Sequence, residues 1–288
     1  GAMDELPGNR CQKVAAVEQS MRLGQRLQKD RRTGQKSLFE SFGQDDIDES
    51  ANLPQVEEWP SLELLNYEKD ALGFYMSGHP LLEHRSLLEQ LSSCTVSDLA
   101  NQTPDSGQTL GGMVVSLKRT ATKRGDSMAR IEFEDLSGKA DAVLFPEAFQ
   151  RYGALAAPGA IVFVRGTVDR SMDRPSFRID EVVPIADAPA KLARSVTLRL
   201  VRLGTSEETL SDLHNVCLRH PGSAGVLLDI LMPDHTRVIL RAGRDVAVAV
   251  NPRFLADVEA LIGPGRTVLA PAPFEGNGGN GRRRNGPP

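Results

Sequence analysis

The sequence contains few cysteines and few aromatic residues, and it lacks long apolar runs. Its 288 residues include three cysteines, one tryptophan and three tyrosines. No apolar stretch reaches the roughly 18 residues that indicate a membrane-spanning helix. Cys11, Cys94 and Cys217 lie far apart, and no CxxC or Cys/His spacing typical of a metal site occurs. We therefore expect reduced thiols, a cytoplasmic location, no membrane contact, and no metal or other cofactor in this chain.

The composition is that of a globular protein with unevenly placed charge. Apolar residues make up 40% and charged residues 25% of the chain, and the length suits one large or two small domains. The net charge of -4 combines a basic first segment, an acidic stretch from Asp45 to Glu58, and three arginines in the tail. Overall acidity argues against a dedicated nucleic-acid coat protein, but it leaves room for a local binding face.

In the first hundred residues, apolar residues recur at helical spacing on both sides of a polar segment. Apolar residues within 9–30 predict one amphipathic helix that ends near Gly34. Residues 40–58 are rich in polar and acidic residues and predict a linker. A second helix is expected from Ser61 to the Gly78-His79-Pro80 break, because the residue before a proline disfavours helical geometry. A further short helix is expected at residues 81–91.

From Thr109 onward the spacing changes from helical to extended. Alternation and turn residues predict strands at 110–117, 128–134, 140–145, 161–168 and 177–185, with a helix at 146–152. Gly111 and Gly112 in the first strand indicate a bend or a close backbone approach. Three strands, a short helix and two more strands is the order of an OB-fold barrel, in which the helix closes the base.

The last third predicts a small α+β unit after a joint at residues 187–190. We expect strands at 196–200 and 244–250, a hairpin at 225–240, and helices at 207–219 and 252–262. The remainder, 271–288, is rich in Gly, Asn and Pro, which predicts disorder.

A short segment, Gln35-Lys36-Ser37-Leu38-Phe39, lies between the basic helix and the acidic linker. Large apolar residues such as Leu38 and Phe39 are usually buried, yet the sequence around them is polar. One interpretation is a linear motif whose Leu38 and Phe39 enter a pocket of another protein while Gln35 fixes the register. The other is that the pair folds back onto a helix of the same chain. The local sequence leaves both open.

Several longer strings carry a family resemblance. They are Glu68-Lys69-Asp70-Ala71-Leu72-Gly73-Phe74-Tyr75-Met76-Ser77-Gly78-His79-Pro80-Leu81, Thr122-Lys123-Arg124-Gly125, Phe133-Glu134-Asp135-Leu136-Ser137-Gly138 and Leu144-Phe145-Pro146-Glu147. The chain resembles the alpha subunits of bacterial replicative DNA polymerase III, the C-family polymerases, over residues 4–270. The match of the last unit is carried by His220-Pro221-Gly222-Ser223 and Gly263-Pro264-Gly265.

The resemblance implies partners for the chain. In this family a Gln-x-x-Leu-Phe pentapeptide binds the beta sliding clamp, and Gln35, Leu38 and Phe39 fall on its specified positions, with Lys36 and Ser37 on the variable ones. This favours clamp binding over intramolecular packing. The last domain is expected to contact the clamp-loader tau subunit, through residues that the resemblance does not locate.

The resemblance also implies that this chain is a C-terminal portion without catalytic residues. The family's metal-binding aspartates, and the magnesium they hold, belong to a palm domain upstream of residue 1. The rest of the polymerase is therefore an expected partner of this chain.

The barrel is expected to bind single-stranded template DNA through a basic groove. The candidate residues lie in two loops and on one strand: Lys118, Arg119, Lys123, Arg124, Arg170, Arg174 and Arg130. Alternatively these are ordinary loop charges, because Asp126, Asp169 and Asp173 lie among them. Phe133, Phe145 and Phe163 are aromatic residues that could stack on bases, although their strand positions favour the core.

The predicted fold is therefore multi-domain α+β. Its parts are an amphipathic helix following a helix-hairpin-helix region (4–34), the clamp motif and acidic linker (35–60), a helical segment (61–105), an OB-fold barrel (108–187), a small α+β C-terminal domain (190–270) and a disordered tail (271–288). The alternative function is a stand-alone OB-fold module that binds single-stranded DNA, with an incidental clamp motif.

Overall fold

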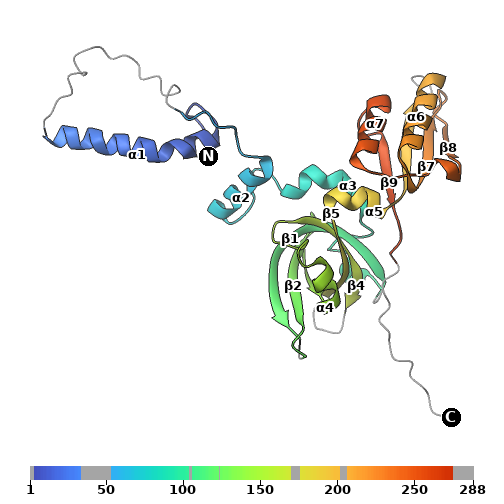
Figure 1. Cartoon of the computed structure of the whole chain (residues 1–288), viewed down its shortest axis with the longest axis horizontal. Coiled ribbons are helices and arrows are strands. Elements are labelled where there is room, and N and C mark those ends of the chain that lie inside the picture. The colour runs from blue at the N-terminus through green and yellow to red at the C-terminus, as the bar shows by residue number, and fades with distance from the viewer. Residues whose placement is uncertain are drawn as a thin grey trace, which may run out of the picture. The chain divides into compact units, whose positions relative to one another are not determined.

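A computed structural model describes residues 3–33, 53–103, 106–122, 124–169, 176–201 and 206–274 (Figure 1). The chain forms two compact units, Gly1–Pro80 and Leu81–Pro288. The predicted clamp motif at 35–39 lies outside the described residues, as do Lys123, Arg170 and Arg174. No helix in the described ranges is long and apolar enough to cross a membrane.

The first unit is built on helix α1 (Arg10–Thr33). Asn9 and Gln12 cap its amino end reciprocally: Asn9 Oδ1 accepts from the Gln12 N–H at 2.7 Å, and Gln12 Oε1 accepts from the Asn9 N–H at 2.9 Å. The Glu58 carboxylate accepts from the N–H groups of Arg10 and Cys11 at 2.8 and 3.0 Å. A negative charge is favourable there because the helix dipole is positive at this end. The segment before α2 is thereby held to the start of α1.

The apolar stripe predicted on α1 does not form a buried face in this unit. Val14, Val17, Met21 and Leu23 are all exposed, whereas Ala16 is buried. Periodicity locates the helix, but it does not by itself supply a surface for the helix to pack against.

Helix α2 (Ser61–Leu72) is shorter than the predicted one. It ends because Gly73 adopts φ 84° and its N–H donates to the Lys69 carbonyl at 2.7 Å, a left-handed cap that glycine favours. The following turn folds back onto α2, where Glu68 accepts from the Ser77 N–H and hydroxyl. The stop therefore lies at glycine, well before the Gly78-His79-Pro80 break.

The second unit contains a closed five-stranded barrel, which confirms the predicted OB-fold. The strand order is β1-β2-β3-β5-β4, and β4 closes onto β1. The parallel β3–β5 pair joins the two halves. The elements are β1 (Gly107–Ala121), β2 (Ser127–Glu134), β3 (Lys139–Leu144), α4 (Pro146–Tyr152), β4 (Ile161–Asp169) and β5 (Ser176–Pro184).

The barrel core is aromatic and aliphatic, and helix α4 packs against it. Phe133, Phe177 and Ile131 are among its fully buried side chains, and Phe149 of α4 packs against the cluster. Gly112 is necessary for the tight closure of β1, since a Cβ there would overlap the Glu134 carbonyl oxygen. This is the close backbone approach that the sequence indicated.

A helical connection precedes the barrel and a four-stranded sheet follows it, both within the second unit. The sheet order is β8-β7-β6-β9. The remaining elements are η3 (Pro80–His84), α3 (Arg85–Leu91), η4 (Leu99–Asn101), η5 (Ile185–Asp187), α5 (Ala188–Leu192), β6 (Ala193–Val201), α6 (Glu207–Arg219), β7 (Pro221–Leu231), β8 (Arg237–Arg241), η7 (Arg244–Val246), α7 (Pro252–Ile262) and β9 (Thr267–Pro271).

Helices α6 and α7, which connect strands of this sheet, pack against each other. Each of them begins at a side-chain cap. Ser206 accepts from the Thr209 N–H, and Asn251 accepts from the Phe254 N–H. Their buried residues, with the buried apolar row on β6, form the small core of this domain: Leu213, Val216, Cys217, Phe254, Val258, Ile262, Val196, Leu198 and Leu200.

Three sequence-based expectations in this region differ from the structure. The predicted strand at 244–250 is instead the short helix η7 followed by an isolated bridge at Val248. The predicted joint at 187–190 contains most of helix α5. Strand β9 was not predicted, and residues 271–274 belong to the fold: Pro271 ends β9, and the Phe274 ring lies 4.4 Å from the Arg165 guanidinium carbon.

Candidate nucleic-acid interface

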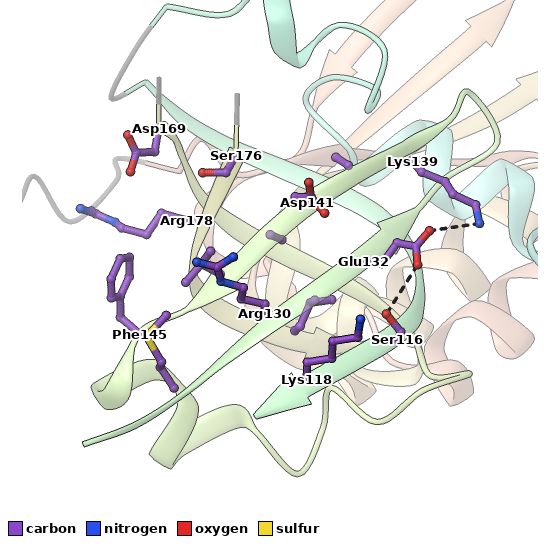
Figure 2. A pocket seen from close by; sticks show the side chains of 15 residues that line it. Ser116, Lys118, Arg130, Glu132, Lys139, Asp141, Phe145, Asp169, Ser176 and Arg178 are labelled. Atoms are coloured by element: carbon purple, nitrogen blue, oxygen red, sulfur yellow. Dashed lines mark hydrogen bonds and ion pairs between the residues drawn. The ribbon is translucent and has the colours of Figure 1, made fainter. Parts of the chain in front are cut away.

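A groove runs along the outer face of the barrel, mainly over β1, β2, β3 and β5 (Figure 2). Its volume is about 840 Å³. OB-folds bind oligonucleotides on this strand face. The charged and aromatic side chains that line it are Lys118, Arg130, Glu132, Lys139, Asp141, Phe145, Asp169 and Arg178.

Strand register brings three cations into one row across this groove. Lys118 on β1 pairs with Arg130 on β2, Arg130 with Val143 on β3, and Val143 with Arg178 on β5. Figure 2 shows Arg130 between the other two cations. Three strand spacings separate the ends of the row, so it spans about 14 Å. We refer to Lys118, Arg130 and Arg178 as the cation row.

The charges of the cation row are only partly neutralised. Lys118 and Arg130 are exposed, and neither forms an ion pair with another residue in the described ranges. Arg178 approaches Asp180 on the same strand, with Nε 3.4 Å from Oδ1. Burial raises the pKa of Asp180 above its ordinary value, and the nearby Arg178 charge opposes that rise. Lys118 and Arg130 are therefore the cations of the row best placed to meet phosphates.

The opposite end of the groove is neutralised by its own ion pairs. Lys139 Nζ lies 3.2 Å from Glu132 Oε1 and 3.5 Å from Glu134 Oε2. Burial lowers the pKa of Lys139, but the hydrogen bond to Glu132 and the charge of Glu134 outweigh it, so this pKa is raised. Lys139 is therefore charged and engaged by two carboxylates, so the cation row carries the less compensated positive charge of the groove.

One aromatic ring is exposed in the groove. Phe145 follows β3 directly and precedes Pro146, the first residue of α4. Its ring is 43% exposed, whereas Phe133 and Phe163 are buried at 1% and 0%. Figure 2 places Phe145 near Arg178 and Arg130. An exposed ring beside cations is the pairing that binds unstacked bases and their phosphates.

The structure separates the other predicted DNA-binding residues. Arg119 lies one position beyond Lys118 and points to the other side of β1, where its guanidinium carbon is 5.8 Å from the Phe149 ring of α4. Arg124 is exposed in the turn between β1 and β2, which Thr122 holds by accepting from the Asp126 N–H. Thus Lys118 and Arg130 share the groove, and Arg119 does not.

Sequence reasoning missed Arg178, the third cation of the row. It belongs to β5, and only the parallel β3–β5 pairing brings it beside the β1–β2 hairpin. The sequence did contain one indication of its orientation, because Arg178 alternates along β5 with Phe177 and Ile179, which are buried, so its side chain faces outward.

In the described ranges, no group of three His, Cys, Asp or Glu side chains could hold a metal ion.

A comparison with known protein families supports the OB-fold assignment of the barrel. A family described as "OB-fold nucleic acid binding domain" matches residues 108–185. The match covers the whole closed barrel, including the groove and the cation row. The barrel is thus an OB-fold, similar over these residues to that family.

Comparison with curated proteins finds DNA polymerase III subunit alpha repeatedly. The protein of Bacillus subtilis is 29% identical over 79% of this chain, and that of Pseudomonas fluorescens 30% identical over 82%. The Vibrio cholerae protein is 25% identical over 93% of the chain. These matches cover 20%, 20% and 23% of the relatives, so the chain spans about a fifth of their length. The resemblance drawn from the motifs is confirmed.

Two solved structures are similar to about three tenths of the chain. The second OB-fold domain of replication protein A from Methanococcus maripaludis is 20% identical, with 32% of this chain and 95% of that one covered and a TM-score of 0.24. The protein PriB from Ralstonia solanacearum is 13% identical, with 27% and 96% covered and a TM-score of 0.24.

Proposed function

We propose that this chain, which is related to the alpha subunit of bacterial DNA polymerase III over most of its length, holds single-stranded template DNA in the groove of its OB-fold. The observation that carries the proposal is the cation row with Phe145 exposed beside it, on the ligand face of a barrel from a nucleic-acid-binding family. The chemistry is binding, and no bond is made or broken in this groove.

The groove chemistry suits an unpaired strand. Phosphates meet Lys118, Arg130 and Arg178, while a base whose face is free stacks on Phe145. A duplex keeps its bases stacked within the helix and offers no face to this ring. Binding should be indifferent to sequence, because every base has a face that can stack and the cations meet only the backbone.

A direct test is a titration of the full chain with a fluorescein-labelled oligothymidylate, read by anisotropy. Arg130→Glu reverses the charge at the centre of the row, and Arg151→Glu makes the same change on α4, where Arg151 pairs with Glu147. We expect Arg130→Glu to weaken binding at least about tenfold and Arg151→Glu to change it less than about twofold. Equal effects of the two substitutions, or equal affinity for duplex, would refute the proposed groove.

Clamp binding through Gln35, Ser37, Leu38 and Phe39 is a further part of the proposal, supported by the sequence motif. A peptide covering residues 33–41 should bind the beta sliding clamp and lose binding with Leu38→Ala and Phe39→Ala together. The matched control carries Lys36→Ala, at a variable position, and Ser41→Ala, outside the pentapeptide, and should bind nearly as well. If both double substitutions have the same effect, the motif is not the contact.

Contact with the clamp-loader tau subunit is proposed for the α+β domain at 190–270, on the resemblance of its His220–Ser223 and Gly263–Gly265 strings. The full chain should capture tau, and a chain ending after residue 187 should not. The polymerising activity, and the magnesium it requires, are assigned to the four fifths of the relatives that this chain does not match.

The second candidate is a stand-alone module that binds single-stranded DNA. The OB-fold family match, limited to the barrel, favours it. It predicts oligonucleotide binding without clamp binding, so the peptide titration distinguishes the two candidates.

A further inference from the structure

The two edge strands of the four-stranded sheet differ in their contacts with the rest of the chain. At the β9 edge, the Leu269 N–H donates to Gln90 Oε1 of α3 at 2.6 Å, and the strand ends in Pro271. At the other edge, all five residues of β8 are exposed, and no described segment pairs with its outer side. An open edge strand offers unpaired N–H and C=O groups to another chain.

The register shows which backbone groups of β8 point outward. The Met232 N–H donates to the Thr236 carbonyl at 2.8 Å, and the Ala242 N–H to the Val226 carbonyl at 3.0 Å. In an antiparallel ladder hydrogen-bonded pairs alternate, so Val238 and Leu240 bond to β7. The N–H and C=O groups of Arg237, Ile239 and Arg241 therefore face outward.

The side chains of these three residues share one face of the sheet. Ile239 is 66% exposed and lies between Arg237 and Arg241. Arg237 is held in place by Asp229 on β7, which is itself 6% exposed. Arg241 is exposed and forms no ion pair with another described residue. The carboxylate of Asp234, in the turn before β8, accepts a hydrogen bond from the Thr236 N–H.

Arginines on an edge strand often serve only to discourage aggregation. Here, however, Arg237 is fixed by the buried carboxylate of Asp229. The residue between the two arginines is an exposed isoleucine, and not a charged residue or a proline that would discourage pairing at the edge. Val238 and Leu240 leave a second apolar strip on the other face, 37% and 48% exposed. The edge thus combines outward-facing backbone groups, one arginine held by Asp229, a second arginine without an ion pair among the described residues, and apolar side chains on both faces.

We propose that β8 binds an extended acidic peptide of a partner protein, which adds to the sheet as a fifth strand. The peptide residue paired with Ile239 is small or apolar, and its neighbours two positions away on either side are Asp or Glu, opposite Arg237 and Arg241. The residues between carry apolar side chains next to Val238 and Leu240. This inference goes beyond the DNA-binding role of the barrel and does not depend on it.

The test uses the full chain and a capped, labelled peptide with the core Glu-Val-Thr-Val-Glu. Anisotropy gives the affinity, and hydrogen exchange of residues 237–241 gives the position. We expect saturable binding, slower exchange of the Ile239 amide, and at least about fivefold weaker binding of the Lys-Val-Thr-Val-Lys peptide. Arg241→Glu should reduce or reverse this preference.

Two further changes separate strand pairing from charge attraction. A peptide N-methylated on the amides that would face β8 should lose binding, while one with equal methylation on the opposite edge should keep it. Ile239→Pro removes an outward N–H and none that pairs with β7, so peptide binding should be lost while the N–H groups of the β7 ladder remain. Equal binding of the two methylated peptides, equal binding of acidic and basic peptides, or protection of these amides by an oligonucleotide instead would overturn the proposal.

Discussion

The salt dependence of DNA binding measures the cation row directly. Removal of Lys118 and Arg130 by a double alanine substitution should release two phosphates, since both side chains line the groove and lack ion-pair partners in the described ranges. For single strands the slope of log affinity against log salt changes by about 0.7 per phosphate. The substitution should therefore flatten the slope by about 1.4. This difference isolates the two residues, because cations elsewhere contribute equally to both proteins.

The same numbers give the change in affinity. If the row alone binds, three phosphates give a slope of about −2, so affinity falls about 18-fold between 50 and 200 mM salt. In the double alanine variant, where Arg178 is the remaining cation of the row, affinity falls only about threefold over the same salt range. Two exposed contacts at about 0.5–1 kcal/mol each also predict about 5- to 30-fold weaker binding at low salt. The effect of the substitution should therefore shrink as salt rises.

The assay is anisotropy of a labelled oligothymidylate over a series of salt concentrations. The matched control removes two cations elsewhere, Arg151→Ala with Lys191→Ala, each of which pairs with an acid on or near its own helix. It changes the net charge equally and should leave the slope almost unchanged. An unchanged slope in the groove variant, or the same flattening in the control, would refute the assignment of the row to phosphates.

Three further predictions concern stacking, closure and acid stability. Phe145→Ala should weaken oligonucleotide binding by about 1–3 kcal/mol without changing the salt slope, and Phe145→Trp should restore it; a changed slope would contradict a stacking role. Gly112→Ala should destabilise the barrel by about 2 kcal/mol or more in urea unfolding, because the new Cβ meets the Glu134 carbonyl and the Phe133 ring. Gly138→Ala, where nothing lies within 4 Å, is its control. The hydrogen bond from His220 and the charge of Arg219 lower the pKa of Asp257 below 3.8, so its contribution to stability is full above that pH and is lost as the pH falls through the lowered value. The difference in urea midpoint between the wild type and Asp257→Asn should therefore shrink as the pH falls below 3.8; a difference that persists in acid would contradict this.

The barrel was predictable from sequence because its signals are local. Alternation along β2 places Ala129, Ile131 and Phe133 inside and Arg130 outside, and Pro146 begins the helix after β3. Lys118 and Arg130 were both predicted to lie at the DNA-binding groove, Lys118 from the loop between the first two strands and Arg130 from the second strand. The strand and helix assignments depend on residues within a few positions of one another.

The rest depended on contacts distant in sequence. Arg178 joins the row through the parallel β3–β5 pairing, and no local pattern encodes that neighbour. Arg119 looked equivalent to Lys118, but successive strand residues face opposite sides, and a bulge between Val114 and Ser116 resets which side that is. Strand β9 was missed because its few residues are stabilised by β6 and by Gln90 of α3, far away in the chain.

The balance of charge in the groove bears on how the proposed function would work. Lys118, Arg130, Lys139 and Arg178 face Glu132, Asp141 and Asp169, an excess of one positive charge. Intrinsic affinity for a single strand should therefore be low. If the chain is tethered to a polymerase that already holds the DNA, the local strand concentration is millimolar, and weak contacts suffice. They also break easily as the template moves past. A groove of strongly uncompensated charge would hold the strand more tightly and hinder that movement, so a measurement of weak binding would favour the role within a polymerase over the stand-alone module.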